Sequence, residues 1–239
     1  LFVVVPPRAP GRVSVTVKKA RLAVTRADAY TAEGNAGTVN WGRLQWPDTA
    51  IEANEGQPVP TVYGRAYHPG ITDAGGSHTL IRAEACLGPV STYPWQSAAW
   101  QCHPASFNAQ YGSDYEYMVK IDPAPGGRFD VYYRFSLDNG IEWLYADKNG
   151  NDTNQGPGHL NGCSSDQALR LTVWGIPDVG DVVLNEIFWM GSNAGGSDGP
   201  RDEWLELRNT TAKPFKIGSF SLDVSGGGAA SSTLVLNGV

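Results

Sequence analysis

The chain has 239 residues, a formal net charge of −6 and 18% charged side chains. A general nucleic-acid-binding protein needs a basic surface, so this acidic balance disfavours nucleic acid as a partner. No apolar run reaches the ~20 residues that a membrane-spanning helix needs. The 29 glycines and 16 prolines, beside only two methionines, indicate short strands joined by turns. We therefore predict an all-β chain, and its length favours two tandem β-sandwich domains.

The N-terminal 37 residues are predicted to form an extended strand segment followed by a linker. An apolar run over residues 1–5 precedes a stiff, proline-rich spacer over residues 6–10. Residues 13–17 alternate valine with polar side chains, as a half-buried strand does, and residues 22–24 indicate a second strand. Because the chain begins with leucine rather than methionine, we expect a processed product or part of a longer protein. The basic residues cluster in this region: Arg8, Arg12, Lys18, Lys19, Arg21 and Arg26.

Residues 38–176 are predicted to form a β-sandwich, because strand signals are dense and turns recur at sandwich spacing. The most regular alternation runs over residues 129–136. Asp138-Asn139-Gly140 then predicts a tight hairpin turn, since Asn-Gly tolerates positive φ, and the returning strand is expected from Ile141 onward. A short helical turn is expected near residues 97–100. Further strand faces are predicted from Tyr115, Tyr117, Val119 and Ile121, and from Leu169, Leu171 and Val173.

The three cysteines are Cys86, Cys102 and Cys163, and no CxxC pair occurs among them. Three single-bridge pairings are open. We favour Cys86–Cys102, because both residues lie in strand-like segments separated by a proline-rich turn. Closing such a loop stabilises a fold by ~3 kcal/mol in the chain-entropy description. A disulfide indicates an oxidising compartment, so an extracellular or cell-surface location is expected.

Five aromatic residues are candidates for a carbohydrate-binding surface: Trp41, Trp46, Tyr93, Trp95 and Trp100. Aromatic faces stack on the C–H surfaces of sugars, and a polysaccharide is therefore one predicted partner. Tryptophan is usually highly buried, so the same residues equally suit the core or the covered ends of a sandwich.

A loop rich in oxygen-bearing side chains follows the predicted hairpin. Asp147, Asn149 and Asn151 occupy alternate positions, and Asp152 follows them, as in the opening of a calcium loop. Asp152 stands where an EF-hand loop has Gly, and Gly158 stands where it has Glu. Two interpretations stay open: a calcium site, the one cofactor that the sequence suggests, and a solvated turn.

Residues 181–239 form a third region after the Pro/Gly boundary at 176–180. Asn-Glu closes its first predicted strand, and Asp-Glu-Trp-Leu-Glu-Leu-Arg-Asn forms its second, over residues 202–209. Its predicted strands are Val182–Phe188, Trp204–Arg208, Phe215–Val224 and Ser232–Leu236. A Gly/Ser-rich loop separates the first two strands.

This pattern resembles the lamin-tail domain, which implies a partial immunoglobulin-like sandwich over residues 181–239. The residues that match its motif are Asn185, Glu186, Glu203, Trp204, Glu206 and Asn209. The resemblance implies a non-catalytic module of secreted or cell-surface proteins. The match ends at Val239, before the family's remaining strands, and an incomplete sandwich of this kind suits strand donation between neighbours. The middle region resembles an uncharacterised β-rich module of secreted bacterial proteins, in residues 40–47, 61–67 and 132–147.

Catalytic motifs are missing from the sequence. There is no Gly-x-Ser-x-Gly elbow, P-loop or strand-linked Gly-x-Gly-x-x-Gly. Cys102, His103, His159 and Cys163 lack a standard zinc-ligand spacing. We predict that the chain is not an enzyme, with any catalytic domain elsewhere in a longer parent protein.

Three functions fit these observations. The favoured one is a structural or adhesive subunit of an extracellular assembly or filament, in which self-association or contact with neighbouring domains proceeds by strand pairing. The alternatives are a carbohydrate-binding module of a secreted hydrolase and a nucleic-acid-targeting accessory domain of a secreted nuclease. The last alternative rests only on the kinds of domain that occur beside related modules.

Overall fold

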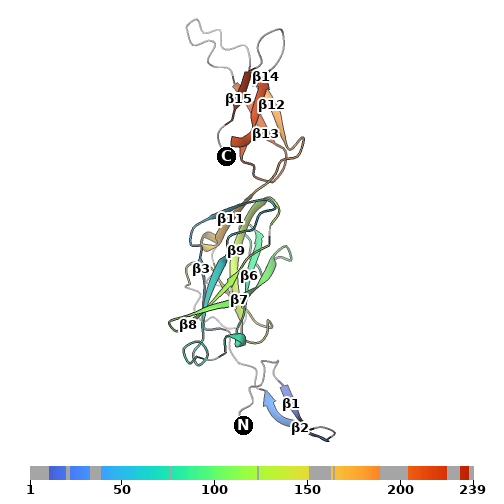
Figure 1. Ribbon diagram of the computed structural model, residues 1–239, viewed down its shortest axis with the longest axis vertical. Helices are drawn as coiled ribbons and strands as arrows, with labels where there is room; N and C mark the ends of the chain where they lie inside the picture. The colour runs from blue at the N-terminus through green and yellow to red at the C-terminus, as the bar shows by residue number, and fades with distance from the viewer. Residues whose placement is uncertain are drawn as a thin grey trace. The chain divides into compact units, whose positions relative to one another are not determined.

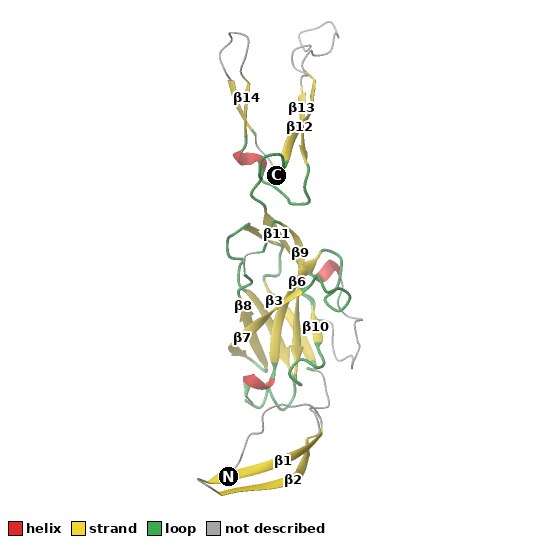
Figure 2. Ribbon diagram, turned by 90° about the vertical axis from the view of Figure 1, so that its right-hand side faces the viewer, coloured by secondary structure: helices red, strands yellow, loops and turns green. Residues whose placement is uncertain are grey.

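The computed structural model describes residues 11–19, 22–32, 39–75, 77–122, 124–150, 163, 165–188, 204–224 and 232–236. Strands dominate these residues, which confirms the predicted all-β class (Figure 2). The helical segments found in them are three-residue 3₁₀ turns at His78–Leu80, Ser165–Gln167 and Ile217–Ser219. No helix in this part of the chain has the length and hydrophobicity required to cross a bilayer.

The chain divides into two compact units. The first unit comprises Leu1–Ile51, Pro58–Asp122 and Phe129–Leu171. The second comprises Glu52–Gln57, Pro123–Arg128 and Thr172–Val239. Two short segments from the middle of the sequence therefore belong to the same unit as the C-terminal region.

Within the described residues, nine strands form one curled sheet, and Figure 1 shows most of them side by side; the pairs that join β3, β5, β8, β7, β6, β9 and β10 are antiparallel. Its order is β3-β5-β8-β7-β6-β9-β11-β4, with β10 paired to β9. The strands are β3 (Trp41–Trp46), β4 (Ile51–Asn54), β5 (Val62–Tyr67), β6 (Arg82–Pro89), β7 (Gln101–Tyr111), β8 (Asp114–Val119), β9 (Gly127–Ser136), β10 (Leu144–Ala146) and β11 (Leu169–Trp174).

The sheet curls until β3 and β5 pack on β9. Two glycines permit this approach: a Cβ at Gly42 would lie 2.7 Å from the Phe135 ring, and one at Gly64 would lie 2.5 Å from Tyr133. The Tyr133 hydroxyl is buried between strands, and it lies 3.2 Å from the carbonyl oxygens of both Val62 and Tyr117. Aromatic packing and satisfied polar groups thus close the core of the first unit.

The turn after β9 combines a confirmed and a corrected prediction. Asn139 and Gly140 adopt positive φ values of 62° and 96°, as the Asn-Gly signal predicts. The returning strand begins at Leu144 rather than at Ile141. The reason is that the Asp138 carboxylate accepts hydrogen bonds from the amides of Ile141 and Glu142, which stabilises a wider loop.

The predicted helical turn at residues 97–100 is a non-helical turn in the structure. The predicted strand over residues 215–224 is also corrected. A 3₁₀ turn at Ile217–Ser219 precedes β14 (Ser221–Val224), and the Phe220 amide donates to the Ile217 carbonyl over 2.9 Å. Pro214 has no backbone N–H, so it cannot donate the hydrogen bond that a strand beginning before Phe215 would need.

The N-terminal region forms a hairpin of β1 (Gly11–Lys19) and β2 (Leu22–Ala32), with an irregularity between Val13 and Val15. The C-terminal region forms two further two-stranded sheets. One pairs β12 (Val182–Phe188) with β13 (Trp204–Asn209), and the other pairs β14 with β15 (Ser232–Val235).

Candidate functional site

The described apolar residues of the N-terminal hairpin are exposed. Val17 and Val24 are cross-strand partners, and they are 67% and 63% exposed. On the opposite face, the hydroxyls of Thr16 and Thr25 are hydrogen-bonded at 2.7 Å. Every described side chain of the hairpin, at positions 16–18 and 23–27, is exposed. A two-stranded hairpin is only marginally stable alone in water. Packing of these exposed side chains against another surface would therefore stabilise the hairpin.

The β12–β13 hairpin has one apolar face. Leu184 pairs with Leu207 and Ile187 with Leu205, so these four side chains share a face. Leu184 is 45% exposed and Ile187 55% exposed, although such a face is normally buried in a sandwich. The outer edges of β12 and β13 have no sheet partner in the described part of the chain. The hairpin therefore offers both an apolar face and free backbone groups.

The opposite face of this hairpin carries two carboxylates. Glu186 and Glu206 are direct cross-strand partners. The Asn185 side-chain amide donates to Glu206 over 2.9 Å, and Phe188 stacks on Trp204 at 6.1 Å between ring centroids. Like charges that face each other directly destabilise a strand pair. A cation brought to this face would relieve that repulsion.

The residues of the predicted lamin-tail motif have local structural roles. Asn185 lies at the register shift of β12 and contacts Glu206. Asn209 accepts hydrogen bonds from the Thr211 amide and hydroxyl and donates to the Lys213 carbonyl, which orders the turn after β13. Glu203 lies outside the described residues.

A cavity of about 360 Å³ lies within the second unit. Its lining includes Arg128, Trp174, Val182, Leu207, Phe215 and Ile217. Val182 and Leu207 belong to the apolar face of the β12–β13 hairpin, so this face is only partly covered at one end. The walls are mostly apolar and bring no nucleophile together with a base.

Among the described carboxylates of the second unit, Glu55 has the most hydrogen-bond donors around it. Its oxygens accept hydrogen bonds from the amides of Gly126 and Ile176, each at a distance of 3.0 Å, and from Lys213 Nζ at a distance of 3.2 Å. These donors favour the ionised form, and they lower the pKa of Glu55 to about 2. The arrangement links the three chain segments that build this unit.

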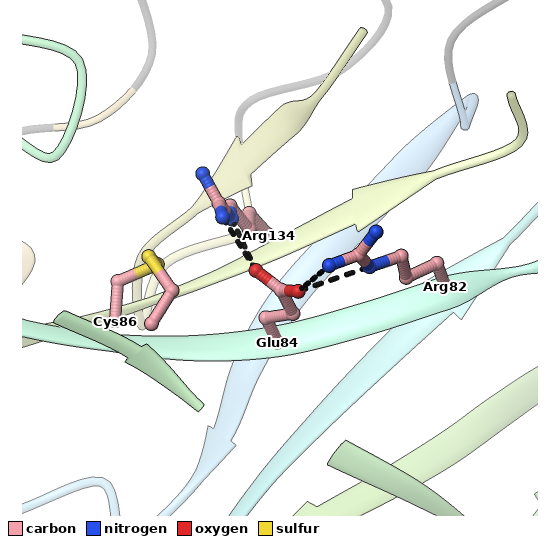
Figure 3. The surroundings of a disulfide bond; sticks show 5 residues. Arg82, Glu84, Cys86 and Arg134 are labelled. Carbon is pink, nitrogen blue, oxygen red and sulfur yellow. Dashed lines mark hydrogen bonds and ion pairs between the residues drawn. A yellow bond between two sulfur atoms is a disulfide. The ribbon is translucent and has the colours of Figure 1, made fainter. Parts of the chain in front are cut away.

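The predicted disulfide joins Cys86 of β6 to Cys102 of β7, at directly paired positions (Figure 3). Two residues away on β6, Glu84 is buried. It accepts hydrogen bonds from Arg82 Nε and Nη2, over 3.0 and 2.6 Å, and from Arg134 Nε over 2.8 Å. The Trp143 ring lies 4.0 Å from the Arg134 guanidinium carbon. We call Arg82, Glu84 and Arg134 the ion-pair ladder. Both oxygens of Glu84 accept hydrogen bonds within it, so we assign it a structural role.

The five candidate aromatic residues fall into separate places. Trp100 is buried and packs on Tyr132 beside the disulfide, and its Nε1 donates to the Thr92 hydroxyl. Tyr93 stacks on Trp95 at 4.7 Å, and both are half-buried.

Trp41 and Trp46 lie on β3. Trp41 donates to the Gly150 carbonyl, and Trp46 is 53% exposed. The structure therefore brings together only Tyr93, Trp95 and Trp100, and it gives Trp100 a core role.

The candidate calcium loop is described in part. The Asp147 carboxylate accepts the Asn149 amide over 2.9 Å, which is the geometry of an ordinary Asx turn. Asn151 and Asp152 lie outside the described residues, so the calcium site stays a prediction. No group of three or more His, Cys, Asp or Glu side chains able to hold a metal occurs in the described part. Cys102 is in the disulfide and is not available as a thiolate ligand.

Comparisons of the sequence with protein-family models and with curated proteins give no match. The relation to the lamin-tail family therefore stays a prediction. Sequence reasoning missed the Glu84 ion pairs and the Glu55 contacts, because Arg134 lies 50 residues from Glu84 and the donors to Glu55 lie 71 or more residues away. The exposed valine pair was signalled by period-two alternation, which indicates a face but not whether another sheet covers it.

Proposed function

We propose that this protein is a non-catalytic, extracellular structural protein that works by assembling with copies of itself or with neighbouring domains through strand pairing. The observation that carries the proposal is the exposed apolar surface of two-stranded hairpins at both ends of the described chain: Val17 and Val24 at one end, and Leu184 and Ile187 at the other. Exposed strand edges pair readily with other chains.

An extracellular location is supported by the Cys86–Cys102 disulfide, since such bonds persist in oxidising compartments. The non-catalytic assignment is supported by the arrangement of the buried carboxylate Glu84. Its two oxygens accept hydrogen bonds from Arg82 and Arg134, which favours a structural role for this carboxylate.

The test is the absolute mass of the chain by light scattering over a range of concentrations. We expect masses above the 25.6 kDa of one chain, rising with concentration. The double variant Val17→Lys/Val24→Lys should return to the mass of one chain, because lysines on this face oppose burial.

The matched control is Ile141→Lys, which changes an exposed apolar residue in the central sandwich and should assemble as the original chain does. A single-chain mass at every concentration for the original protein would contradict the proposal.

A second candidate function is polysaccharide binding, favoured by the exposure of Trp46 on the edge strand β3 and by the half-buried Tyr93–Trp95 stack. Titration of tryptophan fluorescence with a panel of soluble polysaccharides tests it. A response that Trp46→Ala removes would support this function, and no response across the panel would eliminate it.

A further inference from the structure

The two terminal hairpin regions carry opposite charge. Residues 11–32 contain five lysines and arginines against one carboxylate, whereas residues 181–209 contain six carboxylates against two arginines. Lys18 and Arg26 are exposed, and neither forms an ion pair within the described residues. Charge complementarity of this kind selects partners and increases the association rate.

The carboxylate pair on β12–β13 forms no ion pair with a described residue. Glu186 and Glu206 face each other across the strand pair, both exposed, and neither has an ion-pair partner in the described part of the chain. The only side-chain hydrogen bond seen there for the pair is the one from Asn185 to Glu206. This face therefore combines like-charge repulsion with two exposed carboxylates that a basic side chain of another chain can reach.

The two hairpins also match in the pattern of their faces. On β1–β2, Val17 and Val24 occupy one face, while Lys18 lies on the other. On β12–β13, the leucines and Ile187 occupy one face, while the two glutamates lie on the other. Edge-to-edge pairing that makes the apolar faces continuous places Lys18 on the same side as Glu186 and Glu206.

We infer that the basic hairpin β1–β2 of one copy adds, edge to edge, to the acidic hairpin β12–β13 of a second copy, forming a four-stranded sheet. The occupant of the β12–β13 surface is thus a second copy of this chain. This inference rests on the proposed function and specifies its two surfaces. Backbone hydrogen bonds supply affinity, and the charges set partner and orientation.

The pairing is head to tail, because the two contacting surfaces differ. A heterologous contact leaves one donor hairpin and one acceptor hairpin unused at the ends of every open oligomer. The assembly therefore grows as a chain or closes as a ring. An interface between two identical hairpins would instead stop at a dimer.

The inference is tested with charge reversals in the full chain, measured by sedimentation or light scattering. Lys18→Glu and Glu186→Lys should each weaken self-association by at least about tenfold, because like charges then meet across the interface. An equimolar mixture of the two variants should regain association, since each reversed hairpin finds a complementary partner in the other. Association should also be stronger at about 0.01 M than at about 0.15 M salt, where the Debye length is about 8 Å.

The control is Lys120→Glu, an equal charge change at an exposed position of the first unit, which should associate normally. If the original chain assembles but Lys18→Glu behaves like this control, the inference is overturned and the proposed function stands. If each variant is weakened and the mixture stays weak, residues 18 and 186 do not meet across the interface and the inference is again overturned. If the original chain never assembles, the proposed function fails with it.

Discussion

The central sheet and the terminal hairpins are built from the same kinds of strand, yet they differ in what covers them. In the central sheet, Tyr133 and Phe135 of β9 are fully buried and close-packed. In the hairpins, Val17, Val24 and Ile187 are more than half exposed. The difference teaches that strand propensity decides where strands form, whereas the number of packed neighbours decides how much each strand stabilises the fold.

The comparison extends to the charged groups. Glu84 in the central sheet is buried between two arginines, whereas the carboxylates of Glu186 and Glu206 face each other. The first arrangement is complete within one chain. The second becomes favourable when a cation arrives, which fits a surface that meets a partner.

The largest expected contrast comes from matched truncations of the two regions. Phe135→Ala should destabilise the fold by about 4 kcal/mol, because it removes a fully buried aromatic side chain. Val17→Ala should cost less than about 0.5 kcal/mol in the single chain, because Val17 is exposed. Urea unfolding at low protein concentration measures both, and similar losses would show that the hairpin is packed like the core.

The next largest effect is expected from reduction of the disulfide in the central sheet. Reduction of Cys86–Cys102 should lower the free energy of unfolding by about 3 kcal/mol, since a loop of this length is released. The measurement is urea unfolding with and without a reductant. An unchanged midpoint would mean that the bridge adds nothing to the packed β6–β7 pair.

The buried ion-pair ladder comes third. Glu84→Gln should cost about 2 kcal/mol, because two arginines lose a charged acceptor while remaining partly solvated. Asp122→Asn, at an exposed carboxylate, is the matched control and should change stability little. Equal effects of the two substitutions in thermal unfolding would contradict a structural role for the ladder.

The smallest effect concerns the pH dependence of the second unit. The pKa of Glu55 is lowered to about 2, so its stabilising contribution is present above its unfolded pKa near 4.5 and is lost as the pH falls toward 2. The amide signals of Gly126 and Ile176 should titrate with a midpoint near 2 in NMR spectra. Glu55→Gln should remove this transition, and a midpoint near 4.5 would contradict the hydrogen-bonded arrangement.

Much of the fold can be predicted from local signals. Period-two alternation at β9 and β11, the Asn139-Gly140 turn and the cysteine pair all depend on residues close in sequence or on a simple pairing argument. The wider loop before β10 was not predictable in this way, because it depends on which amides the Asp138 carboxylate accepts. Likewise, the apolar residues before β14 predict a strand, but the structure has a 3₁₀ turn at Ile217–Ser219.

The candidate site was predictable only in part. Alternation identified the valines of β1, but it cannot show that Val17, Leu184 and Ile187 stay exposed. That Glu186 opposes Glu206 follows from the register of β12 and β13, including the shift next to Asn185, and a one-residue slip would reverse the faces. Register depends on tertiary pairing, which a single sequence does not reveal.

The most direct test of the account is hydrogen–deuterium exchange of the full chain at low and at high protein concentration. We predict that amides in β1, β2, β12 and β13 become more protected as concentration rises, while protection in β6 and β9 stays constant. This result would show that assembly completes the hairpins and leaves the central sheet unchanged. Equal protection of the hairpins at both concentrations would contradict the central claim.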